Sequence, residues 1–139
     1  MNYCLGFVFS LERDQVLLLK KARPDWQAGL FNGVGGKVEK GEYSQDAMVR
    51  EFEEETGVST DLDDWEFYVS MQNDDWKVDC YFAFMPIEQM VEACRNSKDS
   101  DEPCKMFPIR SLQDCEVVLS NLKWLVPMAL DEINYKVKV

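Results

Sequence analysis

The chain contains no histidine and no GxSxG motif among its 139 residues. A Ser-His-Asp or Cys-His triad therefore has no base, which argues against acyl transfer of that kind. The five cysteines are odd in number and widely spaced, without a CxxC pair, and histidine, the other common zinc ligand, is absent. We expect reduced thiols and no zinc site, and any general base must be a carboxylate.

Basic residues are scarce, and long apolar runs are missing. The chain carries 15 Lys and Arg against 26 Asp and Glu, a formal net charge of −11. An acidic surface repels polyanions, so we expect no extended nucleic acid and no anionic membrane as partner, whereas a small nucleotide complexed with metal is compatible. The apolar stretch 3–11 lacks a basic lead, unlike a secretory signal, and no segment could span a membrane. We expect a cytoplasmic protein.

Internal repeats, low-complexity tracts and linker-like segments are also absent. With 46% hydrophobic residues, the chain fits a single domain, 1–139, with one core. Nothing in the sequence fixes a dimer surface, so a monomer and a homodimer are both compatible. Apolar patterns predict strands at 4–9, 16–19, 65–71, 78–84 and 105–109, and helices at 87–95 and 119–133. This order favours an α/β domain with a mixed sheet packed between helices.

The most informative segment runs from residue 36 to residue 58 and ends in a dense carboxylate cluster. Ahead of it, residues 28–36 predict a short strand that breaks into a glycine-rich loop, where the backbone can approach a ligand closely. No Gly or Pro interrupts residues 44–56, Ser44 is a candidate N-cap and Gly57 a candidate C-cap. We therefore predict a helix over residues 44–56.

Glu51, Glu54 and Glu55 share one face of this helix, because residues three and four apart lie side by side. Like charges at that spacing repel, and acids near a helix C-terminus oppose the helix dipole. A hard divalent cation such as Mg²⁺ would compensate, because it binds carboxylate oxygens together with substrate phosphates. The alternative is an ordinary solvated acidic face.

The predicted helix belongs to a wider pattern that favours the metal site. The segment resembles an intact Nudix box, and the matching positions are Gly36, Glu42, Arg50, Glu51, Phe52, Glu54, Glu55, Gly57 and Val58. Chance agreement of so many residue types is below about one in a million. The resemblance implies a Nudix-type α/β/α sandwich with a central mixed sheet and the Nudix loop-helix-loop. It also implies Mg²⁺-dependent hydrolysis, with Mn²⁺ as a substitute, of a nucleoside diphosphate linked to another group.

The same resemblance implies roles for individual residues of the box. Glu54 and Glu55 are expected to be metal ligands, and Glu51 a ligand or the general base. The backbone carbonyl of Gly36 is expected to be a further ligand. Arg50 is expected to pair with a box carboxylate and orient it, since Glu54 lies four residues on; the alternative is a plain surface ion pair. The base differs among Nudix subfamilies, so that assignment stays open.

A narrower resemblance points to MutT-type enzymes that sanitise oxidised purine nucleoside triphosphates. It rests on Lys20-Lys21 and on the run Phe31-Asn32-Gly33-Val34-Gly35-Gly36-Lys37. It implies that Asn32 hydrogen-bonds the base, whereas the alternative is a turn asparagine before Gly33. The stretch Ser100-Asp101-Glu102 resembles a loop whose glutamate supplies an additional metal ligand, so Glu102 is a further candidate.

Asn121 lies where MutT-like proteins place an Asn or Asp that reads the base, and the alternative is a helix N-terminal residue. Mammalian-type enzymes have paired aspartates where this chain has Asn121-Leu122, which leaves the preferred base open. Candidates for holding substrate phosphates, against a default of solvated surface side chains, are Lys20, Lys21, Arg23 and Lys37. Aromatic candidates for stacking on a base, against the alternative of core packing, are Trp26, Phe31 and Trp124.

Taken together, these resemblances favour a pyrophosphohydrolase that converts a nucleoside triphosphate to a monophosphate and pyrophosphate, with an oxidised purine dNTP such as 8-oxo-dGTP as the leading substrate. An alternative of the same class acts on a pyrimidine dNTP, a dinucleotide or a nucleotide sugar. The alternative from another class is a non-catalytic Nudix module that binds a nucleotide or a protein. The intact carboxylate set argues against it, since a binding module has no need of a crowded acidic site.

Overall fold

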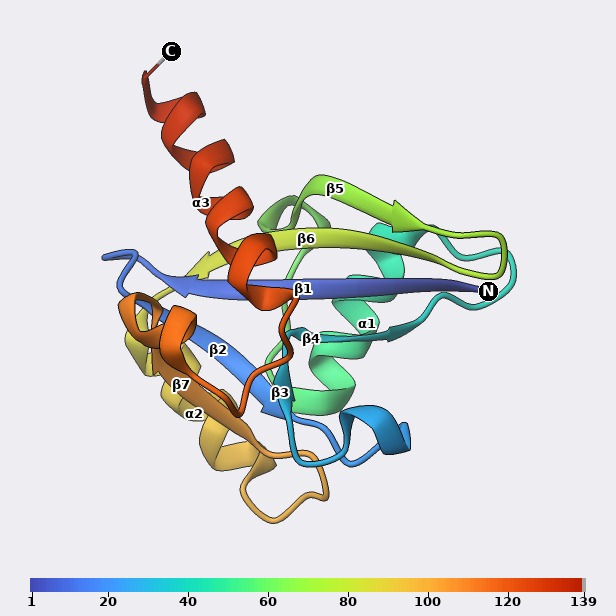
Figure 1. Cartoon of the computed structure of the whole chain (residues 1–139), viewed down its shortest axis with the longest axis horizontal. Coiled ribbons are helices and arrows are strands. Elements are labelled where there is room, and N and C mark those ends of the chain that lie inside the picture. The colour runs from blue at the N-terminus through green and yellow to red at the C-terminus, as the bar shows by residue number, and fades with distance from the viewer. Residues whose placement is uncertain (139) are drawn as a thin grey trace.

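The computed structural model describes the backbone of residues 1–138 and the side chains of residues 1–132. Within that part of the chain, a mixed seven-stranded sheet has the order β3-β2-β1-β6-β5, with β4 paired to β1 and β7 paired to β2 (Figure 1). The strands are β1 (Asn2–Ser10), β2 (Gln15–Lys20), β3 (Phe31–Asn32), β4 (Val34–Lys37), β5 (Glu66–Gln72), β6 (Lys77–Met85) and β7 (Cys104–Pro108). The predicted α/β class and mixed sheet are confirmed.

β1 is the centre of this sheet. It pairs in parallel with β6 along its whole length, while β4 pairs antiparallel with its first half and β2 antiparallel with its second half. The strands predicted at 4–9 and 16–19 pair as the hairpin β1–β2, and those predicted at 65–71 and 78–84 pair as the hairpin β5–β6. A strand with neighbours on both edges cannot shift without breaking hydrogen bonds on each side. β1 therefore fixes the position of β4, which pairs with it.

Helices cover both faces of the sheet, as Figure 1 shows. They are α1 (Ser44–Thr56), α2 (Ile87–Ser97) and α3 (Leu122–Lys138), with short 3-10 turns η1 (Asp25–Gln27), η2 (Leu62–Asp64) and η3 (Ile109–Asp114). Successive strand side chains point to opposite faces, so Val8 packs with α1 and α2 whereas Phe7 and Phe9 pack with α3. None of the helices in the described backbone is both long and apolar enough to cross a membrane.

The helix predicted over residues 44–56 is α1, with one difference at its start. Tyr43 occupies the N-cap position, and the hydroxyl of Ser44 instead shares a 2.5 Å hydrogen bond with that of Tyr81. Ser44 is therefore not the cap, because β6 offers its side chain a partner outside the helix. Gly57 is the predicted C-cap: its φ is 71°, and its N–H donates to the carbonyl of Glu53.

The glycine-rich segment ahead of α1 differs from the prediction. Residues 34–37 form β4 rather than a loop, paired with the first half of β1. A Cβ on Gly35 would lie 2.0 Å from the carbonyl oxygen of Cys4, so only glycine permits this close pairing. The glycines thus let the backbone approach a partner closely, as expected, but that partner is strand β1 and not a ligand.

The C-terminal helix begins later than predicted and passes through Pro127. Residue 119 precedes it, and its backbone N–H instead donates to the carbonyl of Phe31 in β3. Helical periodicity is otherwise confirmed, because the buried side chains of α3 are Leu122, Leu125, Val126 and Ala129. The side chain of Ile133, also expected on this face, lies outside the described side chains.

Candidate active site

Arg50 is the centre of a carboxylate network on α1. Its Nε and Nη2 donate to the two carboxylate oxygens of Glu42, each at 2.9 Å. Its Nη1 donates to Glu51 at 2.9 Å and lies 3.4 Å from Glu54 Oε2, and Nη2 also donates to the carbonyl of Lys37. These hydrogen bonds, above all the one with Glu42, raise the pKa of Arg50 and lower that of Glu42.

The sequence had singled out Glu54 as the partner of Arg50. The structure places Glu54 in this network, but only at its edge, with a side chain that is 59% exposed. Glu42 is the closer, bidentate partner, and it belongs to a turn before α1 in which its backbone N–H donates to the carbonyl of Glu39. Glu42 was one of the matching positions of the box, so a signal for it existed, but helical spacing could not indicate this contact.

Gly36 lies directly against Glu51. A Cβ at residue 36 would be 2.5 to 2.7 Å from the carboxylate atoms of Glu51. A side chain at residue 36 would therefore displace the carboxylate of Glu51, and the glycine leaves room for that carboxylate beside β4. Because the backbone of Gly36 pairs with Cys4 in β1, this strand holds the glycine in place beside the predicted metal ligands.

Glu55 turns toward the interior. Its Oε2 is buried and accepts no hydrogen bond. Burial raises the pKa of Glu55 to about 8, and the neighbouring carboxylates of Glu51 and Glu102 raise it too, while Lys21 opposes them. An unpartnered buried oxygen among acids is costly, so this position is suited to a cation that would supply the missing partner.

Glu102 reaches the site from the loop that precedes β7. Its Oε2 accepts a 2.8 Å hydrogen bond from the backbone N–H of Ala22 and lies 3.4 Å from the ammonium of Lys21. Arg23 pairs with Asp101 and lies 3.7 Å from the other oxygen of Glu102. The structure thus brings Glu102, far away in the sequence, into the electrostatic neighbourhood of Glu55.

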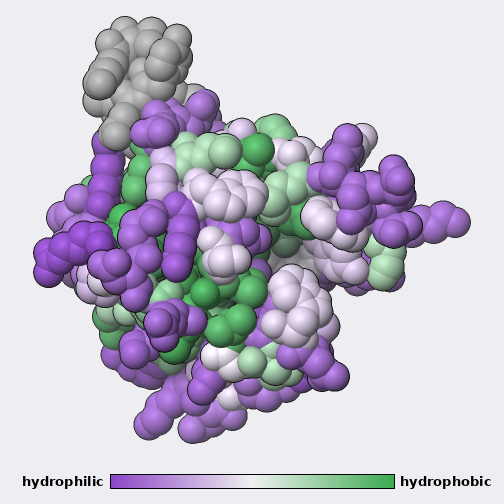
Figure 2. Space-filling model, in the orientation of Figure 1, coloured by the Kyte–Doolittle hydropathy of each residue, from purple (hydrophilic) through white to green (hydrophobic). Residues whose placement is uncertain are grey.

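A cavity of about 550 Å³ opens beside these carboxylates. Its walls come from β1, the β2–β4 region, the β5–β6 hairpin and the start of α3. They include many site residues predicted from the sequence: Lys21, Arg23, Trp26, Asn32, Gly36, Lys37 and Asn121. Figure 2 shows hydrophobic surface near the centre of the face that carries α3, with hydrophilic residues around it. Mostly apolar walls with a few polar groups are typical of small-molecule sites.

Two asparagine side chains present amides to this cavity. Asn121 directly precedes α3 and its backbone carbonyl accepts from Leu125, yet its Oδ1 is buried without a hydrogen-bond partner. The side chain therefore does not cap the helix. Asn32 is half-buried: its Oδ1 accepts from the N–H of Gly33, and its amide nitrogen is 3.4 Å from Gln27 Oε1. Asn32 lies in strand β3, where it pairs with Leu19, and not in a turn, so the turn interpretation is wrong. It also lines the cavity.

Three predicted binding residues do not line the cavity. Phe31 packs edge-on against Phe107 at 4.9 Å between ring centroids, which matches the core alternative. Trp124 is exposed on α3, and Lys20 is exposed at the end of β2, where strand alternation turns it away from Lys21. Phe31 thus packs in the core, and Trp124 and Lys20 lie on the surface outside the cavity, so their binding roles stay predictions.

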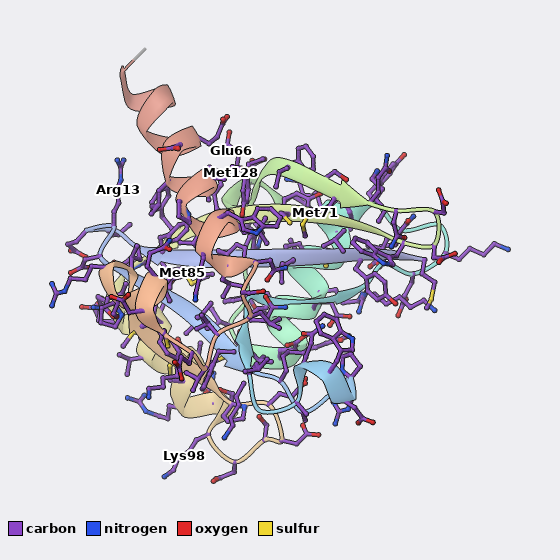
Figure 3. All side chains as sticks on the ribbon, in the orientation of Figure 1. Arg13, Glu66, Met71, Met85, Lys98 and Met128 are labelled. Carbon is purple, nitrogen blue, oxygen red and sulfur yellow. The ribbon has the colours of Figure 1, made fainter. Side chains whose placement is uncertain are left out.

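Other lining residues had not been predicted from the sequence. Trp76 lies at the turn of the β5–β6 hairpin, and Met71 (labelled in Figure 3) lies on β5. Gln27 comes from η1. Trp76 did leave a signal, because a tryptophan beside Asn73-Asp74-Asp75 is unusual in a polar turn.

The model of the NUDIX domain family matches residues 5–125. The chain belongs to the Nudix family. This match covers the sheet, α1 and the first turn of α3. Nudix hydrolases generally use divalent metal cations, which agrees with the chemistry of the carboxylates on α1.

Curated Nudix relatives match part of the chain. An oxidized purine nucleoside triphosphate hydrolase from Mus musculus is 46% identical over 54 residues, 39% of this chain and 34% of that protein. A CTP pyrophosphohydrolase from Escherichia coli is 39% identical over 56 residues, 40% of this chain and 42% of that protein. An uncharacterized Nudix hydrolase from Bacillus subtilis, YvcI, is 47% identical over 45 residues, 32% of this chain and 26% of its own. These matches span less than half the length of each relative.

Solved Nudix structures share the fold over nearly the whole chain. A MutT structure of Aliivibrio salmonicida or Vibrio cholerae has a TM-score of 0.69 at 22% identity, covering 94% of this chain and 97% of its own. Shewanella oneidensis NrtR, solved with a 27mer DNA, has a TM-score of 0.76 at 19% identity, covering 96% of this chain and 62% of its own. The structure of its NUDIX domain with ADP ribose has a TM-score of 0.74 at 18% identity, covering 96% of this chain and 88% of that domain's chain.

The residues of the Nudix site fit a divalent cation in chemistry, though not as a preformed cage. Among the described residues, no three potential ligands converge closely enough to hold a metal ion. Arg50 holds Glu51 and approaches Glu54, while Lys21 holds Glu102. The buried, unpartnered oxygen of Glu55 and the all-carboxylate donor set nevertheless suit a hard cation such as Mg²⁺.

Proposed function

We propose that this Nudix protein is a nucleoside triphosphate pyrophosphohydrolase that uses Mg²⁺, or Mn²⁺ in its place, and yields a monophosphate and pyrophosphate. The supporting observation is one cavity that touches Gly36, beside the carboxylates, and also Asn121, whose buried oxygen lacks a partner. A nucleotide has the matching shape, with a polar planar base at one end and a phosphate chain at the other.

The chain's own residues divide the chemistry among them. Glu51, Glu54, Glu55 and Glu102 would hold the cation, which would neutralise phosphate charge and favour ionisation of the attacking water. Water oxygen attacks a phosphorus of the anhydride, the bond to the bridging oxygen breaks, and a carboxylate accepts the proton. Glu51 or Glu54 serves as that base, and Arg50 orients both. Lys21, Arg23 and Lys37, which line the cavity, would attract the phosphates.

An oxidised purine dNTP such as 8-oxo-dGTP is the leading substrate in this proposal. The mouse relative acts on oxidised purine nucleoside triphosphates, and the amides of Asn32 and Asn121 supply both donors and acceptors to the cavity. Such polar groups can discriminate strongly, because a base that leaves them unpaired binds less tightly. Trp26 and Trp76 add aromatic surface for stacking.

A pyrimidine triphosphate is the second candidate within the same chemistry. The Escherichia coli relative is a CTP pyrophosphohydrolase and matches a similar share of this chain. Dinucleotides and nucleotide sugars are further alternatives, because the carboxylates define the bond and not the leaving group. The alternative of another class is a non-catalytic module that binds a nucleotide or a protein. The same fold occurs in Shewanella oneidensis NrtR, whose NUDIX domain was solved with ADP ribose.

We propose the cytoplasm as the location of this protein. The proposed partner of its surface is a small nucleotide, and neither an extended nucleic acid nor a membrane. Its basis is the net charge of −11, which opposes polyanion binding. The DNA-bound NrtR structure shares only the fold with this chain, which spans 62% of that protein. We further propose one domain, acting as a monomer or a homodimer.

The decisive experiment is incubation with Mg²⁺ and a panel of canonical, oxidised and diphosphate-linked nucleotides, with products identified by mass. Monophosphate plus pyrophosphate from an oxidised purine triphosphate is the expected result. Turnover of dinucleotides or nucleotide sugars alone would keep the metal chemistry and overturn the substrate. Inactivity across the panel, with metal bound, would favour the binding module.

A further inference from the structure

Lys21 lies between the carboxylates and the cavity. Its ammonium is 3.4 Å from Glu102 Oε2, and the two side chains are only 18% and 14% exposed. The same residue lines the cavity together with Asn121. The ammonium of Lys21 therefore contacts an acid, Glu102, and its side chain also lines the cavity.

The other cations near these acids are held differently. Arg50 is fixed by its bidentate contact with Glu42, so it cannot leave the network without breaking several hydrogen bonds. Arg23 is 64% exposed, and its closer partner is Asp101 rather than Glu102. Lys21 is a compact charge on a flexible stem, shielded from water and able to change partners by rotating about its side-chain bonds.

We propose that Lys21 substitutes for a divalent cation at Glu102 when no metal is bound, and that metal binding transfers its ammonium to the phosphates of a nucleotide in the cavity. The inference rests on the proposed function for its second half only. It makes Lys21 a competitor of the metal and a ligand of the substrate, two roles with opposite effects.

The physical reason for this exchange is that the ammonium of Lys21 and a divalent cation compete for the same carboxylate. A divalent ion at Glu102 repels an ammonium at the same carboxylate, and the repulsion is strong at short range in a partly buried site. Removing the ammonium leaves the site more negative, which favours the metal. A nucleotide phosphate in the cavity offers the displaced ammonium a new anionic partner of comparable strength.

The test compares Lys21→Met with Lys20→Met, a matched control. Lys20 is adjacent in β2 but exposed and outside the cavity. Isothermal titration of each purified protein with Mg²⁺ alone, and with Mn²⁺ alone, should show roughly threefold to tenfold tighter binding in Lys21→Met. Lys20→Met should match the unchanged protein. Equal or weaker metal binding in Lys21→Met would overturn the proposal.

A second titration separates this role from simple damage. With Mg²⁺ saturating, inorganic pyrophosphate should bind at least about threefold more weakly to Lys21→Met than to the unchanged protein. Opposite shifts for metal and pyrophosphate are expected, whereas a purely structural defect weakens both. In a Glu102→Gln background the gain from Lys21→Met should shrink, since the shared carboxylate is gone. Full retention of that gain would contradict the contact with Glu102.

Folding and activity do not confound these outcomes. Thermal unfolding checks each variant, and Lys21→Gln repeats both titrations if Lys21→Met unfolds at a lower temperature. If the nucleotide panel shows no hydrolysis while the metal titration shifts as expected, the first half of the inference stands and the proposed function fails. If hydrolysis is observed and the metal titration does not shift, the function stands and the inference fails.

Discussion

Arg50 and Glu42 form a two-pronged ion pair, in which Nε and Nη2 each donate to a separate carboxylate oxygen at 2.9 Å. The pair connects the loop before α1 to the middle of the helix. Through Nη1 the same guanidinium also holds Glu51, so the position of a predicted metal ligand depends on a residue outside the helix.

Arg50→Lys should therefore disturb both fold and activity. A lysine keeps the charge but cannot make the parallel hydrogen bonds, so we expect a loss of about 1–3 kcal/mol in the free energy of unfolding. Turnover should fall by roughly tenfold or more, because Glu51 loses its fixed orientation. Glu42→Gln should lower stability by a similar amount. Denaturant unfolding and pyrophosphate release measure the two effects, and an unchanged Arg50→Lys protein would refute this account.

Glu54→Gln should lower turnover with little effect on stability. Glu54 is 59% exposed, so its replacement leaves no buried group unpaired. If it binds the cation or accepts the proton, kcat should drop by about a hundredfold or more. Glu53→Gln is the matched control, since Glu53 is exposed and bonds Ser59 on another side of α1. Equal activity of Glu54→Gln and Glu53→Gln in a steady-state assay would rule out the assignment of Glu54.

The stability of the protein without metal should fall as pH rises from about 4.5 to about 8. The pKa of Glu55 is raised from its ordinary 4.5 to about 8, so the folded protein binds a proton there more tightly than the unfolded chain. Below pH 4.5 this contribution is fully present, and it is lost as pH passes through the folded value. Melting curves in EDTA across this range test it. Glu55→Gln should flatten the dependence, and a pH-independent difference between the two proteins would exclude Glu55 as its source.

Asn121→Ala should alter binding without destabilising the fold. The buried Oδ1 has no partner to lose, so the melting temperature should not fall by more than about 1 °C. If the amide reads the base, KM for the preferred nucleotide should rise by roughly tenfold with a smaller change for other nucleotides. Parallel kinetic and melting measurements separate the roles. A lower melting temperature with unchanged KM would assign Asn121 to structure alone.

Trp26→Ala and Trp76→Ala should each weaken nucleotide binding by roughly tenfold if these rings stack on the base. Both line the cavity although they are 71% and 39% exposed, so their removal should cost little stability. Trp124→Ala is the control, because that tryptophan is also exposed but lies outside the cavity. Equilibrium titration with a slowly hydrolysed nucleotide measures the affinities. An equal effect at all three positions would argue against specific stacking.

Local signals predicted much of the fold. The helix over residues 44–56 and the two hairpins follow from periodicity and from Gly57, which act within a few residues. Contacts set by distant segments were harder to predict. The Arg50–Glu42 pair requires the loop to fold back, and β4 requires β1 beside it. Trp76 reaches the cavity only after β5 and β6 have paired. The end of β2 also decided which of Lys20 and Lys21 faces the site, since successive residues of an extended chain point to opposite faces.

Gly36 takes part in both the cavity wall and the contact with Glu51, and its strand is hydrogen-bonded to β1. In the proposed function, the distance between the end of the cavity that would hold the base and the end beside the carboxylates is therefore set by main chain, which side-chain replacement does not move. Changes at Asn121 or Trp76 would then alter which base is accepted, while the same bond would still reach the carboxylates. Such a division would let related enzymes differ in the base that they accept while they hydrolyse the same kind of bond.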